Sequence, residues 1–188
     1  VKSIKLKVPG EHNKENARLA YRVATYLGIK EGKVMRSLQN FEGTWRRFEF
    51  KGKTPSGALV YDDYGHHPTE IRATLAGARE LFPKNRIIAV FQPHLYSRTK
   101  LLLNDFALAF HDADEVIVTD IYAARESYDR TIHARHLADF LKKIHPCARY
   151  MKDHNYIVRY LLNTVRHDEV ICIIGAGDIN NVSAGLCV

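Results

Sequence analysis

Side chains that can bind anions or move protons gather in four short segments, each directly after an apolar run. DDYGHHP at 62–68 follows the first run, QPHLYSR at 92–98 the second, DIYAARE at 120–126 the third and GAGD at 175–178 the last. Such apolar runs are typical of strands buried in a parallel sheet. Ligands of open α/β sheets bind beyond the carboxyl ends of the strands. We therefore expect these segments to form one site rather than four unrelated surface loops.

The histidines and the arginine of these segments suit the binding of a small charged molecule. His66, His67 and His94 can donate or accept hydrogen bonds near neutral pH, and their pKa values are open to tuning. Arg98 carries a planar guanidinium that can hold a carboxylate through two hydrogen bonds, although a surface salt bridge is its alternative role. Adjacent histidines rarely point at one ion, and no third ligand is spaced for zinc. We therefore predict no metal site in this chain.

Two nucleotide-binding patterns are incomplete or absent. Gly175 and Gly177 form a GxG pair that is equally well explained as a tight turn after a strand. The full dinucleotide fingerprint needs a third glycine, and position 180 is asparagine, which argues against a nicotinamide enzyme. The P-loop pattern GxxxxGK[ST], which holds nucleotide phosphates, does not occur in the sequence.

Apolar runs and amphipathic segments alternate from residue 57 onward. We expect strands at 58–62, 86–91, 115–119, 170–174 and, more weakly, 148–151, and helices at 68–82, 101–110, 133–144 and 155–165. This alternation predicts an α/β fold, a three-layer Rossmann-like sandwich with a mostly parallel sheet. Before it we expect helices at 11–27 and 33–39, a strand at 46–51 and a loop at 52–57.

Composition narrows the class of protein. The chain has 188 residues, 28 of them basic and 21 acidic, a net charge of +7 that favours anionic partners. The basic residues are scattered, so nucleic acid is a weaker alternative, to be recognised by a steep salt dependence of binding. The three cysteines form no CxxC pattern and suggest reduced thiols in the cytoplasm. The longest apolar run, 170–176, is too short to cross a membrane.

Several motifs, in order along the chain, resemble those of the Mur ligase family. VPGEHNKEN at 8–16 resembles the family's GxHNxxN signature, and FEG at 41–43 with RRF at 46–48 resembles its domain junction. DDYGHHPTE, FQPHLYSRT, TDIYAARE and GAGD resemble the branch of the family that joins L-alanine to UDP-N-acetylmuramate. The likeness runs from about residue 8 to residue 179, nearly the whole chain.

The resemblance implies the domain organisation. Members of the family have a UDP-sugar domain, an ATP-binding domain and an amino-acid-binding domain. Residues 1–48 are then the C-terminal tail of the central ATP-binding domain, 49–56 a hinge or linker, and 57–188 the amino-acid-binding ligase domain. The first residue is valine, so we expect the sequence to begin inside a longer protein, with the P-loop upstream.

The resemblance also implies chemistry and site residues. ATP would phosphorylate the sugar's carboxylate, and the amino group of alanine would attack the acyl phosphate, in the cytoplasmic synthesis of peptidoglycan. Mg²⁺ would be held mostly by the upstream part. Matching positions place His12, Asn13, Asn16, Arg47 and Asp63 around ATP, and Tyr64, His66, His94 and Arg98 around L-alanine. No residue of this chain is assigned a catalytic role.

One departure and several alternatives accompany the resemblance. Many relatives carry arginine where this chain has Leu95, so one cation of the alanine pocket is expected to be missing or supplied from elsewhere. A ligase of the same family that attaches a recycled murein tripeptide is the nearest alternative. A binding or dimerisation module without catalysis is another, and the missing P-loop favours it for the chain alone. No membrane partner is expected.

Overall fold

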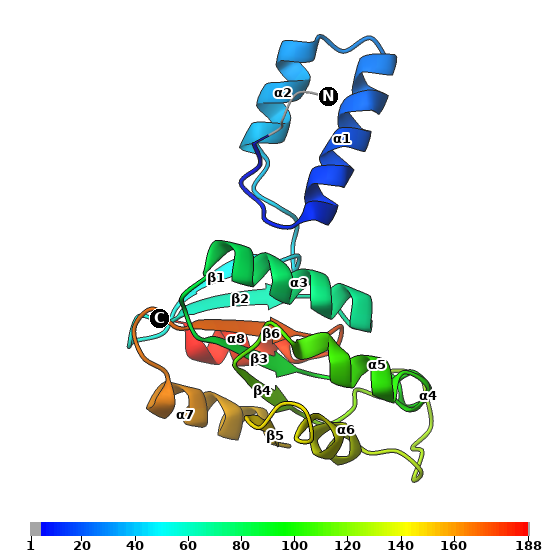
Figure 1. Ribbon diagram of the computed structural model, residues 1–188, viewed down its shortest axis with the longest axis vertical. Helices are drawn as coiled ribbons and strands as arrows, with labels where there is room; N and C mark the ends of the chain where they lie inside the picture. The colour runs from blue at the N-terminus through cyan, green and yellow to red at the C-terminus, as the bar shows by residue number, and fades with distance from the viewer. Residues whose placement is uncertain (1–4, 188) are drawn as a thin grey trace.

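A helical hairpin stands above an α/β unit in the computed structural model, which describes residues 5–187 (Figure 1). Helices α1 (Glu11–Tyr26) and α2 (Glu31–Asn40) form the hairpin, close to the two helices expected there. Gly28, in the left-handed region at φ 79°, ends α1 as expected. Residues 1–4 and 188, which the expected domains include, lie outside the described part of the chain.

Within the described residues, six strands form one sheet in the order β1-β2-β6-β3-β4-β5. Only β1 runs antiparallel to its neighbour, and the other pairs are parallel. The mostly parallel sheet predicted from the sequence is therefore confirmed. The strands are β1 (Glu49–Lys53), β2 (Leu59–Asp63), β3 (Ile87–Phe91), β4 (Glu115–Val118), β5 (Ala148–Tyr150) and β6 (Val170–Ile174).

Strand β1 occupies most of the range expected to be a hinge, 49–56. Its hydrogen bonds to β2, with Glu49 opposite Asp62 and Lys53 opposite Leu59, make it the edge of the sheet. The expected strand at 46–51 is therefore displaced toward 49–53, within the range that was expected to be a hinge. The division of the chain into two domains stays a prediction.

Helices cover both faces of the sheet, which confirms the three-layer sandwich (Figure 1). One face packs against α3 (Pro68–Leu81), α5 (Leu103–Ala107), the 3₁₀ turn η1 (Leu108–Phe110) and α6 (Ala134–Leu141). The other packs against α7 (His154–Thr164) and the short α8 (Asn180–Leu186). Every residue of β3, β4 and β6 is buried, because each of these strands has helices above and below it.

The helix expected at 101–110 is broken and begins earlier. Helix α4 (Tyr96–Leu101) starts within the QPHLYSR segment, and Leu102 leaves helical geometry at φ −105° and ψ 21°. Beyond this break, α5 and η1 place Phe106 and Phe110 against Phe91, each with a ring-centroid distance of 5.4 Å. The apolar periodicity was correct for the buried face, but one straight helix was the wrong interpretation.

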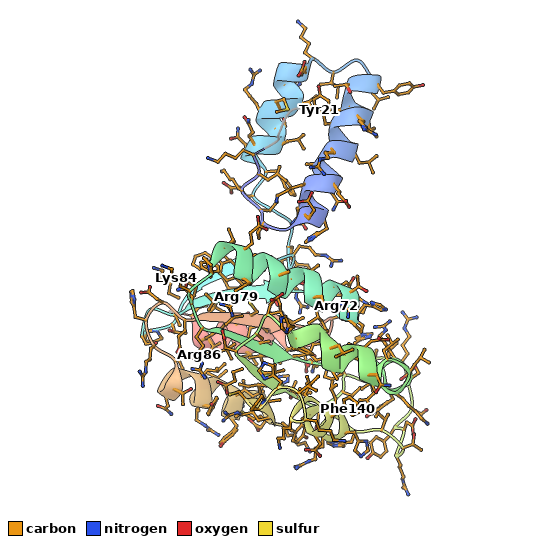
Figure 2. All side chains as sticks on the ribbon, viewed as in Figure 1. Tyr21, Arg72, Arg79, Lys84, Arg86 and Phe140 are labelled. Atoms are coloured by element: carbon orange, nitrogen blue, oxygen red, sulfur yellow. The ribbon has the colours of Figure 1, made fainter. Side chains whose placement is uncertain are left out.

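Ion pairs stabilise the sheet at the amino ends of its strands, which lie away from the polar segments. Arg86 lies between Glu115 and Glu169, and Nη1 of Arg86 is 3.1 Å from Oε1 of Glu169. Figure 2 shows Arg86 on this side of the molecule. The four polar segments lie at the opposite edge, beyond the carboxyl ends of the strands, as the sequence predicts.

Cys172 in β6 gives a test of how tightly the centre of the sheet is closed. Burial, assisted by the nearby Asp63, raises the pKa of its thiol to about 12, so almost none of it is the reactive thiolate at mildly alkaline pH. Cys147 is exposed. Brief alkylation followed by mass spectrometry should label Cys147 in the native chain and spare Cys172, and urea should make both react. Equal labelling rates in the native chain would contradict the packing described for β6.

Candidate functional site

The carboxyl ends of β2 and β3 bring four of the predicted residues into one cluster. Strand β6 lies between these strands and pairs with both. The rings of Tyr64 and His66 meet edge to face at a centroid distance of 5.7 Å, and the rings of His66 and His94 are also 5.7 Å apart. Nη1 of Arg98 lies 3.3 Å from Nδ1 of His94. The structure therefore brings these four residues together, whereas their role and their ligand stay predictions.

A capping box at the start of α3 fixes the loop that carries His66. Nδ1 of His67 accepts the N–H of Thr69, and Pro68 fills the first turn of the helix. Oε2 of Glu70 accepts the backbone N–H groups of His66 at 2.8 Å and His67 at 3.1 Å. Glu70 was not singled out from the sequence, although a capping residue followed three positions later by glutamate is a recognisable pattern.

The segment after β4 is bonded to the segment after β3. The backbone N–H of Leu95 donates to the carbonyl of Tyr122 at 2.9 Å, and the rings of Tyr122 and His94 stack at a centroid distance of 5.7 Å. The carboxylate of Glu126 accepts from the N–H and the hydroxyl of Ser97 at the start of α4. These contacts orient the helical turn that carries Arg98. Tyr122 and Glu126 were not singled out from the sequence.

The charge of the cluster comes mainly from its arginine. Burial lowers the pKa of His94, and the neighbouring Arg98 and His66 lower it further. A buried imidazolium loses hydration, and like charges nearby disfavour its protonation. Near neutral pH His94 is therefore neutral beside a permanently charged guanidinium. This combination suits a bound carboxylate, which the arginine attracts while the imidazole supplies hydrogen bonds.

Buried Arg46 ties the last polar segment to the junction with the hairpin. Its Nε donates to Oδ2 of Asp62 at 3.0 Å, and its two terminal nitrogens donate to the carbonyls of Gly175 and Gly177. Arg46 is 4% exposed. The side chain of its neighbour Arg47 is 53% exposed. Nothing in the sequence distinguishes these two adjacent arginines.

The five residues predicted around ATP share a cavity of about 700 Å³ between the hairpin and α3. They line it together with apolar side chains such as those of Ala17 and Phe41. The predicted set is His12, Asn13, Asn16, Arg47 and Asp63. The structure thus brings these residues together, and the identity of the ligand stays a prediction.

Two of these five side chains also hold the chain in place. Nδ2 of Asn13 donates to the carbonyl of Pro9 at 2.6 Å. Asp63 is buried, and its carboxylate accepts the N–H groups of Phe48 at 2.8 Å and Gly65 at 2.7 Å. A ribose contact by Asp63 would therefore use the lone pairs that remain on these oxygens.

The cavity and the cluster are joined through Glu70. Nη1 of Arg47, which lines the cavity, lies 3.9 Å from Oε1 of Glu70. Oε2 of the same carboxylate lies 3.5 Å from Nδ1 of His66 in the cluster. A ligand in the cavity and a small molecule in the cluster would thus lie close to each other, with the carboxylate of Glu70 between them. That arrangement suits a reaction between two bound substrates.

Among residues 5–187, no three His, Cys, Asp or Glu side chains are arranged to hold a metal ion. Over the same residues, no helix has the length and apolar character needed to span a membrane.

Comparison with known proteins assigns the family. The family described as "Mur ligase, glutamate ligase domain" matches residues 46–177. The chain belongs to the Mur ligase family. It is 46% identical over 178 residues to a UDP-N-acetylmuramate–L-alanine ligase from Caldanaerobacter subterraneus, and 46% identical over 182 residues to one from Desulfitobacterium hafniense. These matches cover 95% and 96% of the chain but only 38% and 40% of the two relatives.

Solved structures agree with this family assignment. The UDP-N-acetylmuramate–alanine ligase of Thermotoga maritima superposes on 96% of the chain with a TM-score of 0.81 and 33% identity, and the chain covers 38% of it. A murein peptide ligase from Psychrobacter arcticus matches with a TM-score of 0.68 at 22% identity, which supports the fold alone. This Mur ligase chain therefore spans about two fifths of the length of the relatives it matches.

Proposed function

We propose that the chain is the amino-acid-binding part of an ATP-dependent ligase that joins L-alanine to UDP-N-acetylmuramate in peptidoglycan synthesis. The observation that carries the proposal is the link through Glu70 between the cavity that contains Arg47 and the cluster that contains His66. The names of the similar ligases support the choice of substrates. The three free thiols support a cytoplasmic setting.

In the proposed reaction, ATP activates the sugar's carboxylate and the residues of this chain position the amino acid. A carboxylate is a poor electrophile, and phosphorylation by ATP gives the sugar's carboxylate a good leaving group. Arg98 then holds the carboxylate of alanine, so that its amino group faces the acyl phosphate. Mg²⁺, when bound, would neutralise phosphate charge. Its ligands would come mostly from the upstream part of the ligase.

Phosphate release by the full-length protein tests the proposal. With UDP-N-acetylmuramate and ATP present, we expect release that depends on added L-alanine, while this chain alone should stay at background because it has no P-loop. Turnover by the isolated chain, or full-length release that ignores alanine, would contradict the proposal. Replacing alanine by the murein tripeptide in the same assay distinguishes the recycling ligase.

Nucleotide affinity gives a second test, on the chain itself. His12, Asn13, Asn16 and Asp63 are predicted at the adenosine side of the cavity, and Arg47 alone at the phosphates. Charge-assisted contacts to phosphate normally dominate nucleotide affinity, so ATP and adenosine should bind with similar, weak affinity. Isothermal titration calorimetry measures both. Sub-micromolar binding of ATP by this chain would contradict the assignment.

A further inference from the structure

The two histidines of the cluster have opposite hydrogen-bond partners at the same ring atom. Nδ1 of His66 lies 3.1 Å from the carbonyl oxygen of Tyr64 and 3.5 Å from Oε2 of Glu70. Both partners can only accept, so this nitrogen carries a hydrogen. Nδ1 of His94 lies 3.3 Å from Nη1 of Arg98. A guanidinium can only donate, so this nitrogen is bare.

The partners at Nδ1 dictate what each ring offers at Nε2. A neutral His66 with its hydrogen on Nδ1 has a free lone pair on Nε2, whereas a neutral His94 has an N–H there. Within residues 5–187, no protein group is hydrogen-bonded to either Nε2 atom. One ring can therefore accept a proton from a ligand, and the other can donate a hydrogen bond to it.

Surrounding charges reinforce this difference. Burial alone would raise the pKa of Glu70, but the backbone N–H groups of His66 and His67, the His66 ring and Arg47 hold it below its usual value. An ionised carboxylate behind His66 attracts the hydrogen on Nδ1 and so favours this tautomer of the ring. The other groups that face His66 are the edge of Tyr64 and the ring of neutral His94.

We propose that His66 is the general base that deprotonates the amino group of the incoming amino acid, and that His94 holds its carboxylate through Nε2–H beside Arg98. The inference rests on the proposed ligase function. An amino acid arrives as an ammonium, which has no lone pair for attack. Glu70 acts as the positioning residue that keeps the hydrogen of His66 on Nδ1.

Proton transfer comes first, and attack on the acyl phosphate and loss of phosphate follow it. Nε2 of His66 takes one proton from the ammonium, and the freed lone pair forms a C–N bond to the carbon of the acyl phosphate. The tetrahedral intermediate collapses with cleavage of the C–O bond, and the phosphate leaves with the electron pair. The departing phosphate accepts the second proton of the attacking nitrogen, which leaves a neutral amide. No oxidant or further reactant is needed.

Imidazole nitrogen NMR on this chain tests the tautomers without any turnover. At a pH where both rings are neutral, long-range ¹H–¹⁵N spectra should place the hydrogen of His66 on Nδ1 and that of His94 on Nε2. The solvent-exposed His167, at the amino end of β6, lies outside the cluster and serves as a reference ring whose Nδ1 is 2.8 Å from Oδ2 of Asp168. A hydrogen on Nε2 of His66 would remove the base and overturn the proposal.

Nucleophile-dependent kinetics of the full-length ligase tests the catalytic role. His66→Gln keeps a polar side chain that cannot take up a proton. With alanine, kcat should fall about 100-fold or more, the lower end of what a general base contributes. With hydroxylamine, which is already neutral at the assay pH and needs no base, the loss should stay within about threefold. His167→Gln should leave both rates unchanged.

The role of His66 as a base and the proposed ligase function are tested by different results. Equal losses with alanine and hydroxylamine would show that His66 only positions the substrates, and would overturn the assignment as base. A wild-type protein that gives no alanine-dependent turnover would instead overturn the proposed function. If His66→Gln does not fold, the NMR experiment on the unaltered chain still decides whether His66 has the required tautomer.

Discussion

Arg98→Ala in the full-length ligase is expected to raise the KM for alanine about tenfold or more. Alanine has little apolar surface, so its recognition depends on its two charged groups. The guanidinium of Arg98 lies beside Nδ1 of neutral His94, where a carboxylate would meet both side chains. A shielded bidentate contact contributes roughly 1.5–3 kcal/mol, and about 1.4 kcal/mol corresponds to one factor of ten. Steady-state kinetics with varied alanine measures the change.

Three further variants test whether the effect comes from the guanidinium of Arg98. Arg98→Lys keeps the charge but loses the planar fork, so it should recover only part of the affinity. Arg166→Ala, at the amino end of β6 on the opposite edge of the sheet, should leave the KM for alanine unchanged. Leu95→Arg should lower that KM or leave it unchanged. An Arg98→Ala enzyme with a normal KM for alanine and a raised KM for ATP would move Arg98 to the phosphate side.

The sheet could be predicted because its buried strands are marked by short runs of consecutive apolar residues. The strand expected at 170–174 and the observed β6 coincide, since a continuous apolar run is what burial on both faces requires. The start of α4 was missed because it depends on a contact that is distant in the sequence. The carboxylate that caps Ser97 belongs to Glu126, 29 positions along the chain, and local periodicity contains no information about a partner so distant.

The site was predictable in location but not in its internal organisation. Placing the polar segments beyond the strand ends followed from topology alone. Which hydrogen each histidine carries depends on contacts of only a few ångströms, such as that of His94 with Arg98 at 3.3 Å. Likewise, two adjacent arginines read alike in sequence, and only tertiary packing buries Arg46 and exposes Arg47.

Arg46→Met is expected to lower the free energy of unfolding of this chain by about 3–5 kcal/mol, the usual cost of removing one partner of a buried ion pair. The variant would leave Asp62 buried without its cation, and Oδ1 of Asp62 already has no hydrogen-bond partner among residues 5–187. The carbonyls of Gly175 and Gly177 would lose donors as well. Urea denaturation measures the loss. Arg47→Met, which alters the neighbouring exposed arginine, should change stability by no more than about 0.5 kcal/mol.

The pH dependence of the Arg46→Met deficit identifies its cause. Burial already raises the pKa of Asp62 in the native chain, although Arg46 opposes this rise, and loss of the guanidinium should raise it further. An acid whose pKa is higher in the folded state stabilises the fold most at low pH and loses that contribution as the pH rises through the folded pKa. The gap between wild type and variant should therefore narrow as the pH is lowered from neutral. A gap that stays constant with pH would mean that lost packing and carbonyl contacts, not the buried charge of Asp62, account for the deficit.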